Sequence, residues 1–311
     1  MGRRIKPAGH PGVYWIGVKD RLQHCGPAAR PVARRGRPVL LGLVLGGLLL
    51  LAPPPAGGFI ILTNGYFRDT ESGSYWIPHG FAYQTINSAV FATQSPAQIE
   101  YDMLEMRKVH ANSLRVDFTW GEIETNDNQF DWSRTDHIVQ TAEDLGLRLF
   151  PLIGYQYPPS WFPTQWLAVK QNREQSNIIN YEHPDARSAY TDFISRVTGR
   201  YQDSPAIAAW ILGNEYAYFD LWETNDPHLF VGYDSISQAA FRNWLSNHYC
   251  GSIAALNSNW GTAYSSFDEV LMSTNYPSDR HDPGYHDLIQ WRKQSIGDSV
   301  ALGAAAARSA D

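Results

Sequence analysis

An asparagine–glutamate pair, Asn214-Glu215, follows the apolar run 207–212 after a single glycine, Gly213. A carboxylate just beyond a buried strand is partly removed from water, and desolvation raises the pKa of a carboxyl group. A carboxyl group with a raised pKa holds its proton near neutral pH and can act as a general acid. The alternative is a surface or helix-capping glutamate. The position after a buried strand favours the catalytic interpretation of Glu215.

Arg115 lies inside a second apolar run, 113–118. An unpaired guanidinium would be costly there, so Arg115 requires a carboxylate or another polar partner. The partner could be an active-site acid that Arg115 keeps ionised, or the pair could be an ordinary buried salt bridge. Asp117 alternates onto the same face of the strand and could simply neutralise Arg115. We favour the functional role for Arg115 and assign none to Asp117.

Aromatic residues gather after the predicted strand ends. Sugars present apolar C–H faces that lie flat on aromatic rings, while polar groups between the rings bind hydroxyls. For any one of these side chains, closing the top of the fold is an equally good explanation. The cluster as a whole favours a carbohydrate site, and it comprises Trp120, Tyr155, Tyr157, Trp161, Phe162, Trp166 and Trp222.

Other chemistries find little support in the sequence. It contains no HExxH motif, no P-loop, no GxSxG motif and no glycine-rich dinucleotide fingerprint after a strand. The ten histidines are scattered, and the segments 226–228 and 279–282 read as loop turns. The two cysteines, Cys25 and Cys250, cannot form a disulfide scaffold or a cysteine-based zinc site. We therefore predict no metal and no cofactor.

The charge is distributed unevenly along the 311 residues. Residues 1–37 hold nine Lys and Arg against one acidic residue, so residues 38–311 carry 16 basic against 30 acidic residues. A body with a net charge of −14 repels phosphate backbones, which excludes nucleic acid as a partner. An apolar content of 43% is ample for a folded core.

The N-terminal region is typical of a targeting signal and not of a folded domain. After the basic stretch 34–37 come uncharged, mostly aliphatic residues 39–52, followed by Pro and Gly at 53–58. This order is typical of a secretory signal. Fourteen helical residues span ~21 Å, short of the ~30 Å hydrocarbon core of a membrane. A retained anchor and a buried core helix are the alternatives. We expect residues 1–58 to be signal and linker, and the protein to be secreted or extracytoplasmic.

From residue 59 the sequence alternates strand-like and helix-like segments, a pattern typical of parallel α/β folds. It opens with a predicted hairpin, residues 60–68 and 75–78. The predicted strands are then 80–84, 113–118, 147–154 and 207–212, and the predicted helices are 96–109, 133–145, 184–201, 235–249 and 284–308. Such a series is what a (β/α)₈ TIM-type barrel shows from its N-terminal side. We therefore interpret residues 59–311 as the N-terminal part of such a barrel.

Three segments, 112–132, 158–161 and 210–216, resemble the catalytic barrel of glycoside hydrolase family 42. This is a family of β-galactosidases within the large clan of retaining (β/α)₈ glycosidases, and the likeness spans roughly residues 76–311. It implies that Glu215 is the catalytic acid/base, that Asn214 holds the sugar hydroxyl beside the scissile bond and that Arg115 belongs to the floor of the site. It also implies lining roles for Trp120, Trp161 and Tyr216.

Two features depart from that family. Its members often carry a zinc-binding cysteine cluster after the fourth strand, whereas residues 217–237 hold no cysteine, so no such zinc is expected. The opening hairpin is more similar to endo-acting β-glycanases of the clan. An endo-β-glycanase of mannanase or glucanase type therefore remains an alternative, as does a sugar-binding protein without catalysis.

A retaining glycosidase needs a second carboxylate about 5 Å from the first. In this clan the second carboxylate follows the seventh strand, but the sequence shows four strand-like runs up to Glu215 and none convincing after it. We therefore expect a barrel truncated after about four strand–helix units. We also expect the 311-residue chain to be inactive alone and a longer parent protein to be the active hydrolase.

Overall fold

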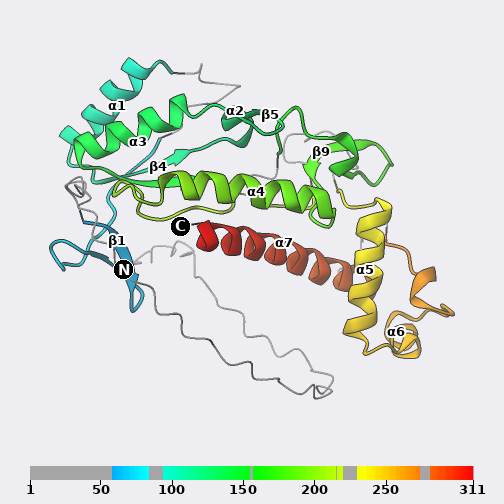
Figure 1. Ribbon diagram of the computed structural model, residues 1–311. Helices are drawn as coiled ribbons and strands as arrows, with labels where there is room; N and C mark the ends of the chain where they lie inside the picture. The colour runs from blue at the N-terminus through cyan, green and yellow to red at the C-terminus, as the bar shows by residue number, and fades with distance from the viewer. Residues whose placement is uncertain are drawn as a thin grey trace, which may run out of the picture. The chain divides into compact units, whose positions relative to one another are not determined.

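The computed structural model describes residues 58–83, 94–154, 157–214, 216–219, 230–273 and 281–310 (Figure 1). All of them belong to one compact unit. The predicted signal or anchor segment, 39–52, lies outside the described residues. Within the described ranges, no helix is both long and apolar enough to cross a membrane.

Three parallel strands form the central sheet in the order β3-β4-β7. Their bounds are Gly80–Tyr83, Ser113–Asp117 and Arg148–Leu152. In this register Arg115 lies between Ala82 on one side and Phe150 on the other. The order and direction agree with the strands predicted from the apolar runs.

A fourth strand segment, 206–211, pairs in parallel with β7 but breaks its register. Leu149 pairs with Ile207, whereas Leu152 pairs with Ile211, so the fourth segment holds one extra residue between the two pairs. The cause is Pro151, which has no N–H to donate to this neighbour. Its carbonyl still accepts from the Ile211 N–H at 2.9 Å, and the ladder resumes beyond a bulge.

The helices that follow the strands are α1, α3, α4 and α7, with bounds Pro96–Lys108, Ser133–Leu145, Pro184–Tyr201 and Pro283–Ala310. α1 packs beside α3, and α7 runs beside α4 (Figure 1). Contacts of Gly303 with Ile194, and of Gly199 with Ala310, show that α4 and α7 run in the same direction. Four consecutive strand–helix units are therefore present, as predicted for the α/β barrel fold.

The two faces of the strands differ in their surroundings. Leu114, Val116 and Leu149 are fully buried against the helices. Residues of opposite parity, Arg115 and Phe150, lie on the other face and are half-buried. This alternation follows from the period of two in a strand, and it leaves the face that would line a barrel interior polar enough for chemistry.

Helix ends follow local side-chain chemistry. α1 begins after Ser95, whose hydroxyl accepts the Gln98 N–H at 3.2 Å. α3 ends at Gly146 in the left-handed conformation. The helix α5, Ser235–His248, is capped by Asp234, since the Asp234 carboxylate accepts the Ser237 N–H at 2.8 Å.

The opening hairpin is shorter than predicted. Its strands are β1, Ile60–Thr63, and β2, Tyr66–Asp69. Asn64 and Gly65 form the turn, both with positive φ, which is the backbone that a two-residue hairpin turn requires. The expected turn at 69–73 is present as well: the Gly73 N–H donates to the Asp69 carbonyl at 2.9 Å, and Tyr75 forms an antiparallel bridge with Arg68. The prediction missed the earlier turn, which divides the predicted first strand in two.

Smaller elements connect the four units. α2 and the hairpin β5-β6 follow β4, the hairpin β8-β9 follows β7, and the helices α5 and α6 precede α7. The remaining bounds are Trp120–Ile123 (α2), Glu124–Asn126 (β5), Gln129–Phe130 (β6), Leu167–Val169 (β8), Gln175–Ile179 (β9) and Ile253–Trp260 (α6), with short 3₁₀ turns at Thr164–Trp166 and Phe267–Glu269. The sequence did not predict the two internal hairpins.

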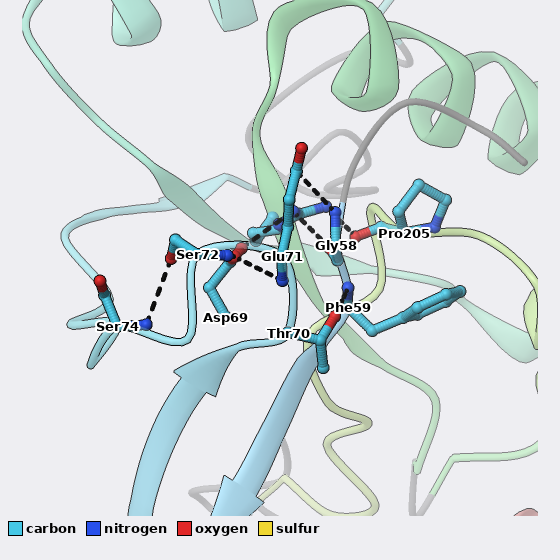
Figure 2. A network of polar contacts seen from close by, with 9 residues as sticks. Gly58, Phe59, Asp69, Thr70, Glu71, Ser72, Ser74 and Pro205 are labelled. Carbon is cyan, nitrogen blue, oxygen red and sulfur yellow. Dashed lines mark hydrogen bonds and ion pairs between the residues drawn. The ribbon is translucent and has the colours of Figure 1, made fainter.

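The chain leading into β1 is held by the turn that follows β2. The Gly58 N–H donates to the Glu71 carboxylate at 3.1 Å, and the Phe59 N–H donates to the Thr70 hydroxyl at 2.7 Å. Figure 2 shows this network, with Pro205 of the segment before the fourth strand close by. The hairpin thus meets the N-terminal ends of the strands.

Arg148, the first residue of β7, connects these parts. Its guanidinium donates to the carbonyl of Gly58 at 2.6 Å and to the carbonyl of Pro205, and it lies 3.7 Å from the Asp69 carboxylate. The side chain is only 15% exposed. One half-buried cation therefore ties the hairpin to β7 and to the fourth strand segment.

Replacing Arg148 by Met should lower the free energy of unfolding by about 2 to 3 kcal/mol, because two charge-assisted hydrogen bonds are lost and two carbonyls are left unpaired. Urea unfolding followed by circular dichroism measures the change. Arg107→Met is the matched control, since the exposed Arg107 donates to one carbonyl, that of Leu145, and its loss should change stability by less than about 0.5 kcal/mol. Equal losses in both variants would contradict the role of Arg148.

Candidate active site

One hydrogen bond joins the middle of β4 to the chain that follows the fourth strand segment. The Arg115 guanidinium donates to the Asn214 side-chain carbonyl over 3.0 Å, although the two residues are 99 positions apart in the chain. Asn214 is exposed, so its amide can reach a ligand. Glu215, the predicted acid/base, lies outside the described residues. Of the predicted site residues, Arg115 and Asn214 are thus brought into direct contact.

Asp117 is buried beside Arg115, with 3.9 Å between its carboxylate and the guanidinium. Desolvation raises the pKa of the Asp117 carboxyl, and the opposing attraction of Arg115 is the smaller effect. Among the described residues, its Oδ1 atom has no hydrogen-bond donor. Arg115 is therefore shared between a neutral amide and a poorly solvated carboxyl group.

Tyr216 turns back onto the strand that precedes it. Its hydroxyl donates to the Leu212 carbonyl at 3.0 Å and lies 2.8 Å from the Tyr190 hydroxyl. Its ring meets Tyr181 edge-on, with 5.9 Å between the ring centroids. The hydroxyl of Tyr216, a predicted lining residue, is thus engaged with protein groups and fixes the turn that contains Asn214.

Gly154 makes this turn possible. A Cβ atom at Gly154 would lie 1.9 Å from the Leu212 carbonyl oxygen and 2.7 Å from the Tyr216 hydroxyl. No side chain fits at either distance. Position 154, just after β7, must therefore be glycine for Leu212 and Tyr216 to take their positions.

Trp120, also predicted to line the site, is 1% exposed. Its indole N–H donates to the Glu124 carboxylate at 2.7 Å, and its ring stacks on Phe193 with 5.0 Å between centroids. The indole therefore presents almost no surface to a ligand and supports the aromatic residues around it.

Trp161 is half-buried and meets Trp120 edge-on at 6.4 Å. Its indole N–H donates to the Glu124 backbone carbonyl at 2.7 Å. With Trp166 it lines a cleft between the β5-β6 hairpin and α4. Arg115 and Asn214 are not among the residues that line this cleft.

Sequence reasoning missed Tyr190 and Gly154. Tyr190 lies on the apolar stripe of α4 and was indistinguishable from an ordinary core residue. Gly154 had a usable signal, because glycine at a strand end often marks a close backbone approach. Tyr155 and Trp222, which the aromatic cluster included, lie outside the described residues.

Within the described ranges, no three His, Cys, Asp or Glu side chains come together in a way that could hold a metal ion.

Parallel strand–helix units with polar groups beyond the carboxyl ends of the strands are the architecture of a (β/α)₈ barrel enzyme. The model of glycoside hydrolase family 42, described as beta-galactosidase, matches residues 91–304. The chain belongs to this family.

Similar proteins carry the same family's activity in their names. The chain is 27% identical over 228 residues to beta-galactosidase Bga of Halorubrum lacusprofundi, covering 68% of this chain and 31% of that protein. It is 29% identical over 203 residues to a beta-galactosidase of Arthrobacter sp., covering 60% and 27%. The solved structure of the Halorubrum lacusprofundi beta-galactosidase superposes with a TM-score of 0.62 at 23% identity, over 75% of this chain and 35% of that one. The chain thus spans about a third of the length of these relatives.

Gly154→Ala should lower the free energy of unfolding by about 2 to 3 kcal/mol, because its methyl group would collide with the Leu212 carbonyl. Gly297→Ala is the control, since Gly297 lies inside α7 with no atom within 4 Å of an added Cβ. That substitution should stabilise the protein by about 0.5 to 1 kcal/mol through helix propensity. Urea unfolding of both variants gives the comparison, and a Gly154→Ala variant as stable as the wild type would refute the close approach.

Asp117→Asn should stabilise the protein at neutral pH. Because the folded-state pKa of Asp117 is raised above 3.8, its contribution to stability is present below that value and is lost as pH rises through the folded pKa. The gain should therefore disappear as pH falls below about 4. Thermal unfolding of wild type and variant between pH 3 and 8 would show this convergence.

Asp131→Asn is the control, because its effect on stability at neutral pH should have the opposite sign. Hydrogen bonds from the Ser133 hydroxyl and backbone N–H hold the pKa of Asp131 below its usual value. Its stabilisation is present above the unfolded-state pKa and is lost as pH falls through the folded-state pKa. Its asparagine variant should be less stable at neutral pH. If Asp117→Asn also destabilises at pH 7, burial of the Asp117 carboxyl is not the dominant effect.

Proposed function

We propose that this chain supplies the acid/base end of a retaining β-galactosidase active site. Glu215 is the general acid/base, Asn214 binds a sugar hydroxyl beside the scissile bond, and Arg115 orients Asn214. The observation that carries the proposal is the 3.0 Å hydrogen bond between Arg115 and Asn214, within a chain that belongs to glycoside hydrolase family 42.

The direction of that hydrogen bond matters for recognition. Since Arg115 has donors only, it takes the carbonyl oxygen of the Asn214 amide. The amide N–H groups of Asn214 then point away from Arg115 and can donate to a sugar hydroxyl. A hydroxyl held in this way positions the neighbouring glycosidic oxygen for protonation by Glu215.

The mechanism also needs a carboxylate nucleophile about 5 Å from the acid/base. The described residues form four strand–helix units, whereas eight strands close a barrel of this type. The relatives are about three times as long as the segment they share with this chain. We therefore assign the activity to a protein in which this chain is combined with strands that supply the nucleophile.

We further propose that the protein is exported. The basic stretch 34–37 followed by the apolar residues 39–52 supports a secretory signal. Polymeric and oligomeric galactosides outside the cell would then be the accessible substrates. N-terminal sequencing of the protein from the culture medium of its host would test export: a mature N-terminus near residue 58 is expected, and an intact N-terminus retained inside the cell would contradict it.

Hydrolysis of lactose by the protein expressed from its whole reading frame should fall by about 100-fold or more in Glu215→Gln, because the amide cannot donate a proton to the departing oxygen. Hydrolysis of 4-nitrophenyl β-galactoside should fall less in its bond-cleavage step, since nitrophenolate leaves without protonation. Initial rates with both substrates measure this difference.

Glu105→Gln is the matched control, because Glu105 is a carboxylate on the outer surface of α1, paired with Lys108. It should retain full activity. Soluble mannan and glucan, tested in parallel, separate galactosidase from endo-β-glycanase activity. A Glu215→Gln variant within threefold of wild type on lactose would remove Glu215 from the mechanism.

A further inference from the structure

A cleft of about 290 Å³ opens between the β5-β6 hairpin, the loop after β7 and the first half of α4. This volume is close to the lower limit of about 300 Å³ for small-molecule sites. Its lining residues are Glu124, Asp127, Asn128, Trp161, Trp166, Asp185, Ser188, Ala189 and Asp192. No residue of the proposed acid/base assembly is among them.

Two indole rings from the loop after β7 contribute to this cleft. Trp166 is held edge-on by Phe162 at 5.2 Å, and Trp161 is fixed by the bond from its N–H to the Glu124 carbonyl. Both side chains are half-buried and held by their neighbours, so little conformational entropy is lost when a ligand covers them. Fixed, partly exposed aromatic rings suit the flat C–H face of a pyranose.

The cleft also offers polar groups that the fold does not use. Within the described ranges, no hydrogen bond involves the Asp185 carboxylate, the Ser188 hydroxyl or the Trp166 indole N–H. By contrast, both oxygens of Glu124 are occupied, one by the Trp120 indole and one by the Asn128 N–H. The unused groups are acceptors and donors of the kind that sugar hydroxyls require.

The charge around the cleft selects among ligands. Asp127, Asp185 and Asp192 are exposed at its edge. Within the part of the chain that the structure describes, Asp192 forms an ion pair with Arg196 at 2.7 Å, Asp127 accepts a hydrogen bond from the Asn128 amide at 3.0 Å, and Asp185 forms no ion pair. Carboxylates accept hydrogen bonds from hydroxyl groups but repel another carboxylate. A neutral sugar is therefore compatible with the cleft, whereas a uronic acid is not.

We propose that this cleft is a second carbohydrate-binding site, which holds one or two units of a neutral oligosaccharide on Trp161 and Trp166. It lies outside the proposed acid/base assembly and does not depend on hydrolysis. Its effect would be to hold a sugar chain on the protein surface while other units of the chain are processed.

Isothermal titration calorimetry of the purified chain with β-1,4-galactotetraose tests the proposal. Trp166→Ala should weaken binding at least about tenfold, which corresponds to about 1.4 kcal/mol, whereas Trp166→Phe should retain most of the affinity. Tyr101→Ala is the control, since Tyr101 is an exposed aromatic residue on α1. Trigalacturonic acid should show no binding at the same concentrations.

Two further variants keep the result interpretable. Ser188→Phe fills the cleft from an exposed helix position and should abolish binding even if Trp166→Ala perturbs the fold. Glu215→Gln should leave cleft binding unchanged, so failure of the hydrolase proposal and failure of this one are separable. Absence of binding to the wild type, or binding that Ser188→Phe leaves intact, would overturn the second site.

Discussion

The missing N–H of Pro151 is the constraint on which the candidate site depends. Because of it, one hydrogen bond between β7 and the fourth strand segment cannot form. The fourth segment holds one extra residue there before pairing resumes at Ile211. Because side chains alternate between faces with a period of two, one inserted residue reverses the face of every residue after it. The position of Asn214 beside Arg115 therefore depends on a bulge within residues 208–210, four to six positions upstream.

A bulge alone would leave the strand end loosely held, and the structure shows what fixes it. The Leu212 carbonyl, next to the bulge, accepts from the hydroxyls of both Tyr216 and Tyr190. Because Gly154 has no side chain, this carbonyl can approach the chain just after β7. Leu212 and Tyr216 are thus held by α4, by the close approach of Gly154 and by each other, which is the kind of support that a neighbouring catalytic group needs.

The sequence predicted the strands and the main helices, because long apolar runs and helical periodicity are strong signals. It required a polar partner for Arg115 but did not identify Asn214 as that partner. It did not predict the turn at Asn64-Gly65, although this dipeptide is a strong hairpin signal, because the apolar pattern continues across it. It also could not assign Trp120 or Tyr216 correctly to ligand or protein contacts. An aromatic residue after a strand has the same sequence signature whether its ring faces a ligand or packs against Phe193.

These placements change how the aromatic richness of the chain should be understood. Trp120 and Tyr216 are used to build the strand ends, so they are poor candidates for sugar stacking even though they neighbour the candidate site in sequence. Trp161 and Trp166 keep part of their surface, and they keep it at a cleft beside α4. In this structure, rings that support the fold and rings available to a ligand therefore separate by location. The buried indole of Trp120 connects the two groups, since it packs against Trp161 on one side and Phe193 on the other.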